Sequence, residues 1–463
     1  MSRVSALLVA ALTLSVLAPA VALADPVQEA GERVAQKAAE QAAASCRRDP
    51  VGRQECAAAL GTADAGEAAI AEYEASELSR TLALQRTLGD GLPLQAGLWV
   101  GTHNSANSTS EDPTLSQSDS NQQLSLSDQL RLDVRSLELD AHWFPSLRSA
   151  GQAPVLCHAQ SRHEGCTTER LLEDGLAEIA GWLDANPGEV VLLYLEDHLD
   201  GQQGHDKAVA DLRSAFGTRL FTPAAGTPGC TQLPLTLTRD AMRAAGAQVV
   251  VMTGGCNDAV GQGWLDTTFS ETQRKEDRPV GYGGYPRCGG VDLTGEDSVF
   301  RRYFEDSTFL NSAATLGGQA SPDDGLTPET VAAMTRCGVD LLGLDQLVPA
   351  DGRLEALAWS FAPGQLDAAA GSCAAQRVSD GRWEATPCKG ERLPAACQLP
   401  DGAWTVSGAG PRVSAEGRCE ELGAVFAVPR RGRDAQLLLE AQQAAGADAV
   451  WLALKSAGNG RWA

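Results

Sequence analysis

Strand-like apolar runs alternate with helix-like segments between residues 97 and 347, and this alternation constrains the fold more than any other feature. The strand-like runs occupy 97–102, 135–142, 153–159, 189–198, 247–255 and 338–347. Segments with helical periodicity lie between some of them, at 124–134, 167–187 and 327–337. Repeated strand–helix units favour a parallel β/α barrel over a sandwich of antiparallel sheets. The part from 221 to 325 is rich in Gly and Pro, so we expect long loops there.

The first 24 residues have the three parts of a secretory signal peptide. A basic start, MSR, precedes an apolar core from Ala6 to Leu17, and Ala22-Leu23-Ala24 supplies the small-residue cleavage site. No later apolar run reaches the roughly 18 residues that a membrane-spanning helix needs. We therefore expect an exported chain, extracellular or periplasmic, without a transmembrane anchor.

The cysteine content indicates the cellular compartment, and the net charge limits the kinds of partner. Twelve cysteines fit an oxidising compartment, although the sequence does not fix their connectivity. Three pairs lie close in the sequence: Cys46 with Cys56, Cys157 with Cys166, and Cys373 with Cys388. The formal net charge of -23 argues against a nucleic-acid partner and against electrostatic adhesion to anionic lipid. It would suit a protein that binds a divalent cation.

Segments of different composition flank the predicted barrel. Residues 25–92 contain two helix-like stretches, VAQKAAEQAAASC and EAAIAEYEASELSRTLALQ, which predict a disulfide-pinned helical hairpin acting as a spacer without activity. The barrel is predicted over 93–362. Residues 363–463 have short strand-like runs and four cysteines, and are expected to form a separate small domain.

Polar side chains stand where four of the predicted strands end. They are His103 with Asn104, Glu138 with Asp140, His158, and Glu196. The carboxyl ends of barrel strands build the active site in proteins of this architecture. Glu138 and Asp140 are two apart on one strand and so share a face. Together with Glu196 and the amide oxygen of Asn104, they could hold a hard cation.

Each of these residues also has a purely structural interpretation. His103 could be a hydrogen-bonded residue at a strand end, and Glu138 and Asp140 could pair with Arg131 or Arg135. Glu196-Asp197-His198 could be an ordinary polar loop. Singly, these interpretations are favoured, but the shared placement at strand ends and the order of the residues favour a functional site.

A zinc site is a further alternative for the segment CHAQSRHEGC. Its candidate ligands are Cys157, His158, His163 and Cys166. Their spacing is unusual for zinc, and an exported chain favours a disulfide between the two cysteines.

The order of the motifs resembles the X-region of the phosphatidylinositol-specific phospholipase C family. The segments that carry the resemblance are THNSANS, LSDQLRLDVRSLELDAH, PVLCHA and WLDANPGEVVLLYLEDH. It extends over about residues 95–200 and becomes diffuse from there to about 350. The resemblance implies a TIM-type β/α barrel, regular or distorted in shape, with His103 as the general base and His158 as the general acid.

The same resemblance implies the cofactor. Metal-independent bacterial members carry an arginine where this chain has Asp140, whereas calcium-dependent members carry an acid there. The residues that match the calcium-ligand pattern are Asn104, Glu138, Asp140 and Glu196. The resemblance therefore implies a Ca²⁺ site. Asp345, in LLGLDQL on the last predicted strand, could orient a catalytic histidine.

The implied activity is cleavage of phosphatidylinositol or a related glycolipid at a membrane surface, through a cyclic inositol phosphate. Glycerophosphodiester phosphodiesterases use similar chemistry on the same barrel, but their early HRG motif is missing from this chain. A second alternative is a non-catalytic binding or adhesion protein built on the barrel. Retention of both histidines and all four candidate ligands favours the enzyme.

The C-terminal segment resembles a C-type-lectin-like domain whose two halves appear in reversed order. DGRWEATPCKGERLPAACQ is similar to the end of such a domain, and the segment that begins at Cys419 is similar to its start. If the module is permuted, Cys397 could pair with Cys419. Glu384 and Ala385 follow Trp383 where sugar-binding members have Asn-Asp, so we expect a structural or protein-binding module, with glycan binding as the alternative.

Overall fold

The computed structural model describes residues 66–110, 120–146, 148–149, 151–159, 163, 166, 169–254, 260–270, 300–305, 326–367, 371–458 and 461–463. The predicted signal peptide, the first helix of the predicted hairpin and the Cys46–Cys56 pair lie outside these residues.

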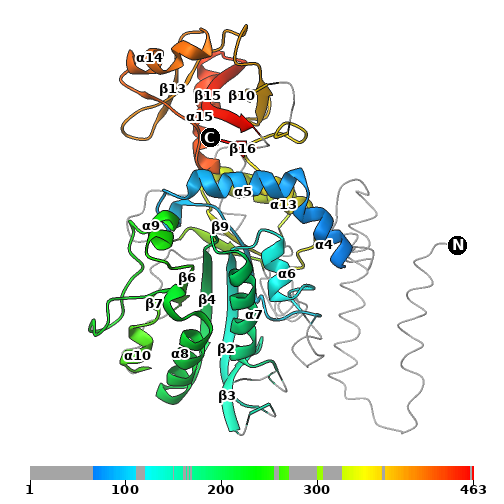
Figure 1. Cartoon of the computed structure of the whole chain (residues 1–463), viewed down its shortest axis with the longest axis vertical. Coiled ribbons are helices and arrows are strands. Elements are labelled where there is room, and N and C mark those ends of the chain that lie inside the picture. The colour runs from blue at the N-terminus through cyan, green and yellow to red at the C-terminus, as the bar shows by residue number, and fades with distance from the viewer. Residues whose placement is uncertain are drawn as a thin grey trace, which may run out of the picture. The chain divides into compact units, whose positions relative to one another are not determined.

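The central feature is a curved parallel sheet in the order β5-β6-β4-β2-β1-β9-β8, in which every neighbouring pair is parallel (Figure 1). A further short strand, β7, pairs with β6 in parallel. The parallel strands of the sheet are β1 (Trp99–Thr102), β2 (Ser136–Ser146), β4 (Val191–His198), β5 (Leu220–Phe221), β6 (Val249–Thr253), β7 (Phe269–Ser270), β8 (Arg302–Phe304) and β9 (Leu341–Leu344). The prediction of a parallel β/α architecture is confirmed.

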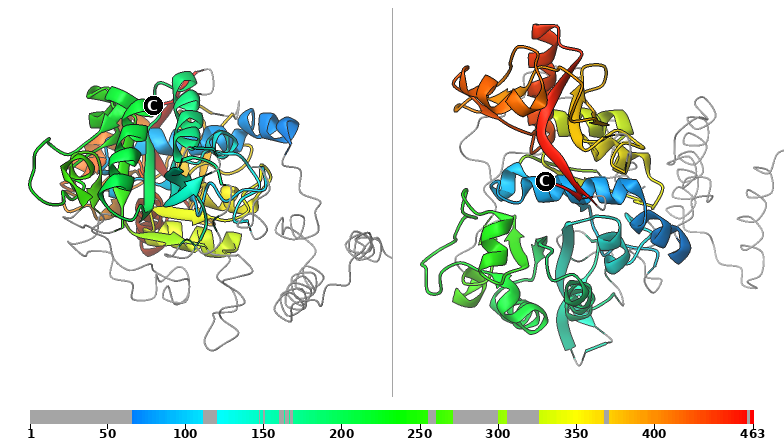
Figure 2. Two further views of the ribbon diagram at one scale, coloured as in Figure 1. Left: turned by 90° about the horizontal axis from the view of Figure 1, so that it is seen from below. Right: turned by 45° about the horizontal axis from the view of Figure 1, so that its top comes forward.

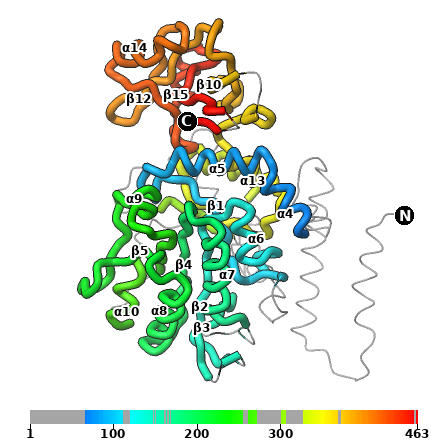
Figure 3. The backbone as a smooth tube through the Cα atoms, in the orientation of Figure 1, coloured from blue at the N-terminus to red at the C-terminus, as the bar shows by residue number. Residues whose placement is uncertain are grey.

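One predicted strand runs in the other direction. The run expected at 153–159 forms β3 (Gly151–Leu156), which pairs antiparallel with the end of β2, from Ala141 with Leu156 to Ser146 with Gly151. The chain folds straight back at this point, as Figure 3 shows at the lower end of the molecule. The sequence places no helix between the runs at 135–142 and 153–159, and a short connection of this kind can only join antiparallel neighbours.

Helices surround this sheet. They are α6 (Leu126–Arg131), α7 (Leu172–Ala185), α8 (Gln202–Phe216), α9 (Arg239–Ala244), α10 (Gln262–Leu265), α12 (Pro328–Cys337) and α13 (Gly352–Leu357). Helices α7 and α8 lie on its outer face, whereas Met242 of α9 belongs to the core of the inner face. Leu137 and Leu139 of β2 share a buried core with Ile179 of α7 and Leu212 of α8. Since side chains alternate along a strand, Glu138 and the residues in phase with it point to the inner face.

Residues 67–89, of which 67–85 were expected as a single helix, form two helices, α4 (Glu67–Glu74) and α5 (Glu77–Gly89). The break lies at Ser76, whose side chain accepts a hydrogen bond from Ser79 N and so caps α5. Arg86 of α5 forms ion pairs with Asp133, before β2, and with Glu189, before β4. The helix α5 is thereby fixed to the amino ends of the parallel strands.

The C-terminal part contains two antiparallel sheets, β11-β10-β15-β16 and β13-β12-β14. The long strand β15 is the most extended element of this part (Figure 2). The elements are β10 (Cys373–Arg377), β11 (Trp383–Thr386), β12 (Ala396–Gln398), β13 (Trp404–Val406), α14 (Ala415–Glu420), β14 (Val425–Phe426), α15 (Gly432–Ala445), β15 (Ala449–Gly458) and β16 (Arg461–Trp462). The resemblance to a C-type-lectin-like domain stays a prediction.

Three of the expected disulfides are present, joining Cys157 to Cys166, Cys373 to Cys388, and Cys397 to Cys419. Cys230 and Cys337, which the sequence did not single out, are also disulfide-bonded. The pairing of Cys157 with Cys166 excludes the zinc alternative, because both thiols are consumed. None of the helices in the described ranges is long and apolar enough to cross a bilayer.

Candidate active site

His103 directly follows strand β1 and lies at the carboxyl edge of the sheet. All four residues of β1 are buried, and Gly101 fits between β9 and β2 so closely that a Cβ would lie 3.0 Å from Leu342 O. His103 N donates the last ladder hydrogen bond to Leu344 O, at 3.3 Å. The strand then ends, because Asn104 takes a left-handed backbone conformation with φ of 43°.

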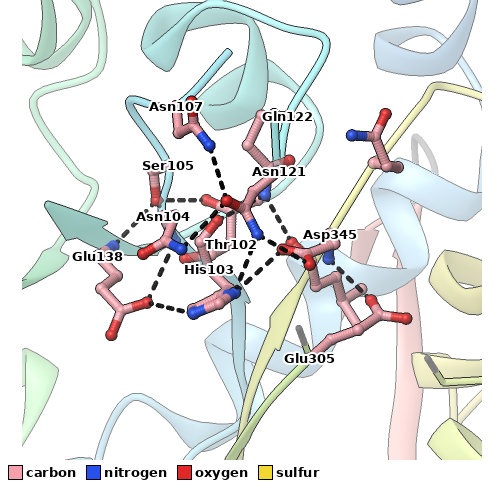
Figure 4. Close-up of polar contacts among 12 residues, drawn as sticks. Thr102, His103, Asn104, Ser105, Asn107, Asn121, Gln122, Glu138, Glu305 and Asp345 are labelled. Atoms are coloured by element: carbon pink, nitrogen blue, oxygen red, sulfur yellow. Dashed lines mark hydrogen bonds and ion pairs between the residues drawn. The ribbon is translucent and has the colours of Figure 1, made fainter. Parts of the chain in front are cut away.

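The turn at Asn104 is held by Glu138 of the neighbouring strand. Asn104 N donates to Glu138 Oε2 at 3.1 Å, and Ser105 N donates to Glu138 O at 2.8 Å. The Ser105 hydroxyl also meets Thr102 Oγ1 at 2.7 Å. The small polar residues after the first strand therefore form a tight turn that presents the His103 ring to the inner face of the sheet (Figure 4).

Asp345 lies beside His103, as the sequence predicted for an orienting aspartate. His103 Nδ1 is 3.2 Å from Asp345 Oδ1, and the Asp345 side chain is only 1% exposed. On the other side of the ring, Nε2 is 3.6 Å from Glu138 Oε2. With its Nδ1 proton donated to Asp345, His103 would present a lone pair on Nε2, which is the form that a general base needs.

The end of β9 is fixed by a buried ion pair between Glu305 and Arg353. Glu305 accepts hydrogen bonds from Asp345 N at 2.8 Å and Leu326 N at 2.6 Å, while Arg353 donates to Asp345 O at 2.6 Å. Burial raises the pKa of Glu305 to about 7, against the lowering effect of the Arg353 charge. The backbone of Asp345 is thus held on both sides.

A glycine makes room for the ring that supports His103. The Phe304 ring lies 5.9 Å from the His103 ring, and a Cβ on Gly343 would lie 1.9 Å from Phe304 Cδ1. Any larger residue at position 343 would displace this ring. The motif LLGLDQL therefore supplies both the space for Phe304 and the aspartate for His103.

The second histidine, His158, lines a small hollow in the protein surface. Its lining residues are Asn104, Ala106, Asn107, Asp140, Cys157 and His158. His158 Nδ1 is 3.1 Å from Asn107 Nδ2. With the Asn107 nitrogen toward it, a neutral His158 ring accepts at Nδ1 and carries its proton on Nε2. As a general acid the ring has to be the imidazolium, protonated on both nitrogens, because a neutral imidazole that lost its proton would become an imidazolate.

The predicted acids lie on adjacent strands in register. Asp140 of β2 is paired with Glu196 of β4, so both side chains face the same side of the sheet as Glu138. Burial raises the pKa of Glu138 to about 6, and a hydrogen bond from His198 at 2.8 Å lowers the pKa of Glu196.

Arg131 and Arg135 are engaged with acids outside the site. Arg131 pairs with Glu67, Glu74 and Asp128, and Arg135 pairs with Glu189. The alternative in which these arginines neutralise Glu138 and Asp140 is therefore wrong.

The donor set of the site suits a hard cation in its chemistry, and its arrangement suits it in part. The Asn104 amide lies 3.1 Å from both oxygens of Asp140, and both of its ends are satisfied when its nitrogen donates to Asp140 and its oxygen faces His158 Nε2 at 3.2 Å. In that orientation the amide oxygen is turned away from Asp140. Glu196 is turned toward His198 instead, and in the described part of the chain no three His, Cys, Asp or Glu side chains converge on one metal position.

The site also holds two residues that the sequence did not reveal, Asn121 and Gln122. Asn121 is fully buried and contacts His103, Asp345, Asn104 and Asn107, as Figure 4 shows. Gln122 donates to His103 O at 2.7 Å and to Leu344 O at 2.9 Å. Both lie in a polar loop before α6, where no local pattern marks them.

Residues 62–351 match the family model described as the Rv2075c PI-PLC-like domain. The chain belongs to this family. Two curated relatives from strains of Mycobacterium tuberculosis, the uncharacterized proteins Rv2075c and MT2135, are each 42% identical over 435 residues, which cover 89% of this chain and 87% of theirs.

The PI-PLC-like domain is also similar to solved structures of bacterial phosphatidylinositol-specific phospholipases C. One from Staphylococcus aureus is 15% identical, with 58% of this chain and 93% of that chain covered and a TM-score of 0.37. One from Listeria monocytogenes is 14% identical, with 60% and 98% covered and a TM-score of 0.38.

In the PI-PLC-like domain, His103 lies beside Asp345 and His158 lines the hollow. A neutral His103 with its lone pair on Nε2 could remove one proton, and a protonated His158 could donate another in the same reaction. The arrangement suits cleavage of an ester in which a substrate hydroxyl attacks.

Proposed function

We propose that this protein is a phosphodiesterase that cleaves phosphatidylinositol or a related glycolipid by general acid–base catalysis. The observation that carries the proposal is the pairing of an aspartate-bound His103 with an amide-bound His158 at one edge of the barrel. Membership of the PI-PLC-like family supports it. A non-catalytic binding protein would not need this arrangement of buried partners around both rings.

The proposed reaction begins with the substrate's own 2-hydroxyl, which lies close to phosphorus in an inositol phosphodiester. His103 Nε2 accepts the hydroxyl proton as the new P–O bond forms. The P–O bond to diacylglycerol then breaks, and His158, protonated on both ring nitrogens, gives its Nε2 proton to the departing oxygen and becomes neutral. The products are a cyclic inositol phosphate and diacylglycerol, and the number of protons on the two histidines together is unchanged.

We further propose Ca²⁺ as the cofactor, held by Asn104, Glu138, Asp140 and Glu196. The support is the oxygen-only donor set, with Glu138, Asp140 and Glu196 on one face of the sheet. A bound calcium ion would stabilise negative charge on the phosphate oxygens. Binding would require Glu196 to leave His198, so calcium should weaken the His198 interaction.

Disulfides in three described pairs fit an oxidising compartment, and with the predicted signal peptide they support export from the cell. The substrate would then be a lipid at a membrane surface outside the cytoplasm. The C-terminal part is proposed to contact a protein or glycan partner, in keeping with its resemblance to lectin-like modules.

The proposal is tested with purified mature chain on vesicles of phosphatidylinositol and, as a matched control, of phosphatidylcholine. We expect diacylglycerol release only from phosphatidylinositol, with calcium present and not with a calcium chelator. Activity that survives the chelator would contradict the calcium assignment alone. Cleavage of glycerophosphodiesters in place of phosphatidylinositol would contradict the substrate assignment and favour the related phosphodiesterases.

A further inference from the structure

Asp345 lies just beyond the end of strand β9, where side chains take the place of a neighbouring strand as its hydrogen-bond partners. Its N–H donates to Glu305 Oε2 at 2.8 Å (Figure 4), and its carbonyl oxygen accepts from Arg353 at 2.6 Å. The next residue, Gln346, has a left-handed φ of 52°, so the chain leaves the direction of the strand here. Both backbone groups of Asp345 are therefore bound by one pair of side chains.

Glu305 and Arg353 form a buried ion pair that joins the edge of the sheet to a helix. Arg353 Nη1 lies 2.5 Å from Glu305 Oε2, and each of the two side chains is only 4% exposed. Glu305 directly follows β8, and Arg353 lies in the first turn of α13. The residue that caps α13, Asp351, accepts from Arg353 Nε at 3.0 Å and so orients the guanidinium group.

The second carboxylate oxygen of Glu305 is also engaged. It accepts a hydrogen bond from Leu326 N at 2.6 Å, next to the residue that caps α12. Donors from three separate segments therefore face one carboxylate group. The residue before Glu305 is Phe304, whose ring lies 5.9 Å from the His103 ring. The end of β8 thus reaches His103 by two routes, through the Phe304 ring and through the hold on Asp345.

Stability alone does not explain why charged side chains lie at this position. A buried ion pair loses its hydration, and replacement of such pairs by apolar side chains of similar volume is often neutral or stabilising. A guanidinium group, however, carries its donors in a rigid planar fork and so fixes the direction of the groups that it binds. Such a fork can hold Asp345 where its Oδ1 lies 3.2 Å from His103 Nδ1.

We propose that Glu305 and Arg353 are positioning residues that hold the backbone of Asp345 and, through it, the His103 ring. Because both side chains are buried, they act through Asp345 and not on a substrate. The catalytic role of His103 rests on the proposed function, whereas the hold on Asp345 does not.

The first test compares Arg353→Lys with the matched control Arg135→Lys. Arg135 is also buried, pairs with Glu189 at 2.7 Å, and donates to the backbone oxygens of Leu130 and Val134 at 2.7 and 2.8 Å. It does so at the opposite ends of the strands. Each lysine keeps the charge and loses the fork, so both variants should unfold at a lower temperature than the wild type.

The two variants should differ in their activity on phosphatidylinositol vesicles. We expect kcat of Arg353→Lys to fall by about 10²-fold with KM unchanged, because displacement of a base slows the reaction without touching the bound substrate. Arg135→Lys should keep the wild-type kcat. Equal kcat values in the two folded variants would overturn the proposal.

A double variant tests whether the effect passes through Asp345. Asp345→Asn already removes the carboxylate that lies beside His103. Addition of Arg353→Lys should therefore lower kcat by no more than about twofold further. Losses that multiply would mean that Arg353 acts elsewhere in the site, which would contradict the proposed route.

Amide hydrogen exchange, measured by NMR, tests the hold on Asp345 without any substrate. We expect the Asp345 N–H to exchange at least about tenfold faster in Arg353→Lys and in Glu305→Gln than in the wild type, because a hydrogen bond to a charged group is weakened. Glutamine keeps the shape of Glu305 but turns one acceptor into a donor. Arg135→Lys should leave this exchange rate unchanged.

The exchange experiment separates this proposal from the proposed function. An Asp345 N–H that exchanges at the wild-type rate in folded Arg353→Lys and Glu305→Gln would overturn the hold on Asp345. Faster exchange in both variants, in a protein that cleaves no phosphatidylinositol, would support the hold on Asp345 and contradict the proposed function alone.

Discussion

Replacement of Asp345 by asparagine tests whether His103 acts as a base through its contact with this carboxylate. The variant has nearly the same shape, and its backbone would stay held by Glu305 and Arg353. If the new NH₂ faces His103 Nδ1, the ring proton moves to Nε2 and the base is lost. If the new oxygen faces His103, the NH₂ meets the Asn121 NH₂, which lies 3.0 Å from Asp345 in the wild type.

The expected loss of kcat in Asp345→Asn follows from the same contact between Asp345 and His103. A hydrogen bond to a buried charge contributes about 1.5–3 kcal/mol, which alone corresponds to roughly 10- to 150-fold in rate. Loss of the reactive form adds to this, up to the roughly 10²- to 10⁴-fold of a positioned base. We expect kcat to fall by about 10²- to 10⁴-fold, while KM changes little because Asp345 is 1% exposed and cannot touch substrate.

The assay is steady-state cleavage of phosphatidylinositol vesicles, with folding checked by circular dichroism. Asp133→Asn is the matched control, because Asp133 is also buried and paired, with Arg86 and Tyr73 at the opposite ends of the strands. That control should lower the unfolding temperature and leave kcat unchanged. A folded Asp345→Asn variant with kcat within about fivefold of wild type would refute the role assigned to Asp345.

Three further predictions concern stability. Burial raises the pKa of Asp340 to about 7. The folded chain therefore keeps a proton that the unfolded chain releases above about pH 4. Because of this, the free energy of unfolding falls as pH rises from about 4 to 7. Asp340→Asn should remove this pH dependence and raise the free energy of unfolding at pH 8 by at most about 4 kcal/mol. Chemical denaturation at a series of pH values measures this, and a variant whose free energy of unfolding falls with pH as steeply as that of the wild type would refute it. Removal of the Cys397–Cys419 disulfide, which closes 22 residues, should cost about 3 kcal/mol in unfolding free energy, and an unchanged unfolding temperature would argue against it. Arg353→Met should cost about 3–5 kcal/mol by leaving Glu305 buried without its charge partner, whereas a calorimetric midpoint equal to that of wild type would contradict a structural role for the pair.

Features set by short stretches of chain could be predicted from the sequence. The alternation in β2 predicted that Glu138 and Asp140 share a face, and the register of β2 with β4 brings Glu196 to the same side. The apolar run of β1 predicted a strand that ends at His103. These patterns depend on neighbours within a few residues, so they are visible without the fold.

Features set by distant contacts could not be predicted. Asn121 donates a hydrogen bond to Asp345, which is 224 residues away, and Arg353 donates one to Glu305, which is 48 residues away. Nothing near Asn121 distinguishes it from an ordinary loop asparagine. The direction of β3 also escaped prediction, because an apolar strand has the same alternation whether it pairs parallel or antiparallel.

The helix break at Ser76 shows the same limit at short range. Residues 67–85 have good helix formers throughout, so propensity alone favours one helix. The structure breaks it because Ser76 can cap a new helix, and α5 is then held against Asp133 and Glu189 by Arg86.

The most direct test of the central claim is ³¹P NMR of the reaction of the mature chain with phosphatidylinositol vesicles in calcium buffer. We expect a cyclic inositol phosphate as the first phosphorus-containing product, and its loss in both His103→Ala and His158→Ala. Appearance of the acyclic inositol phosphate without a cyclic precursor, or a cyclic product made equally well by either folded variant, would contradict the roles proposed for the two histidines.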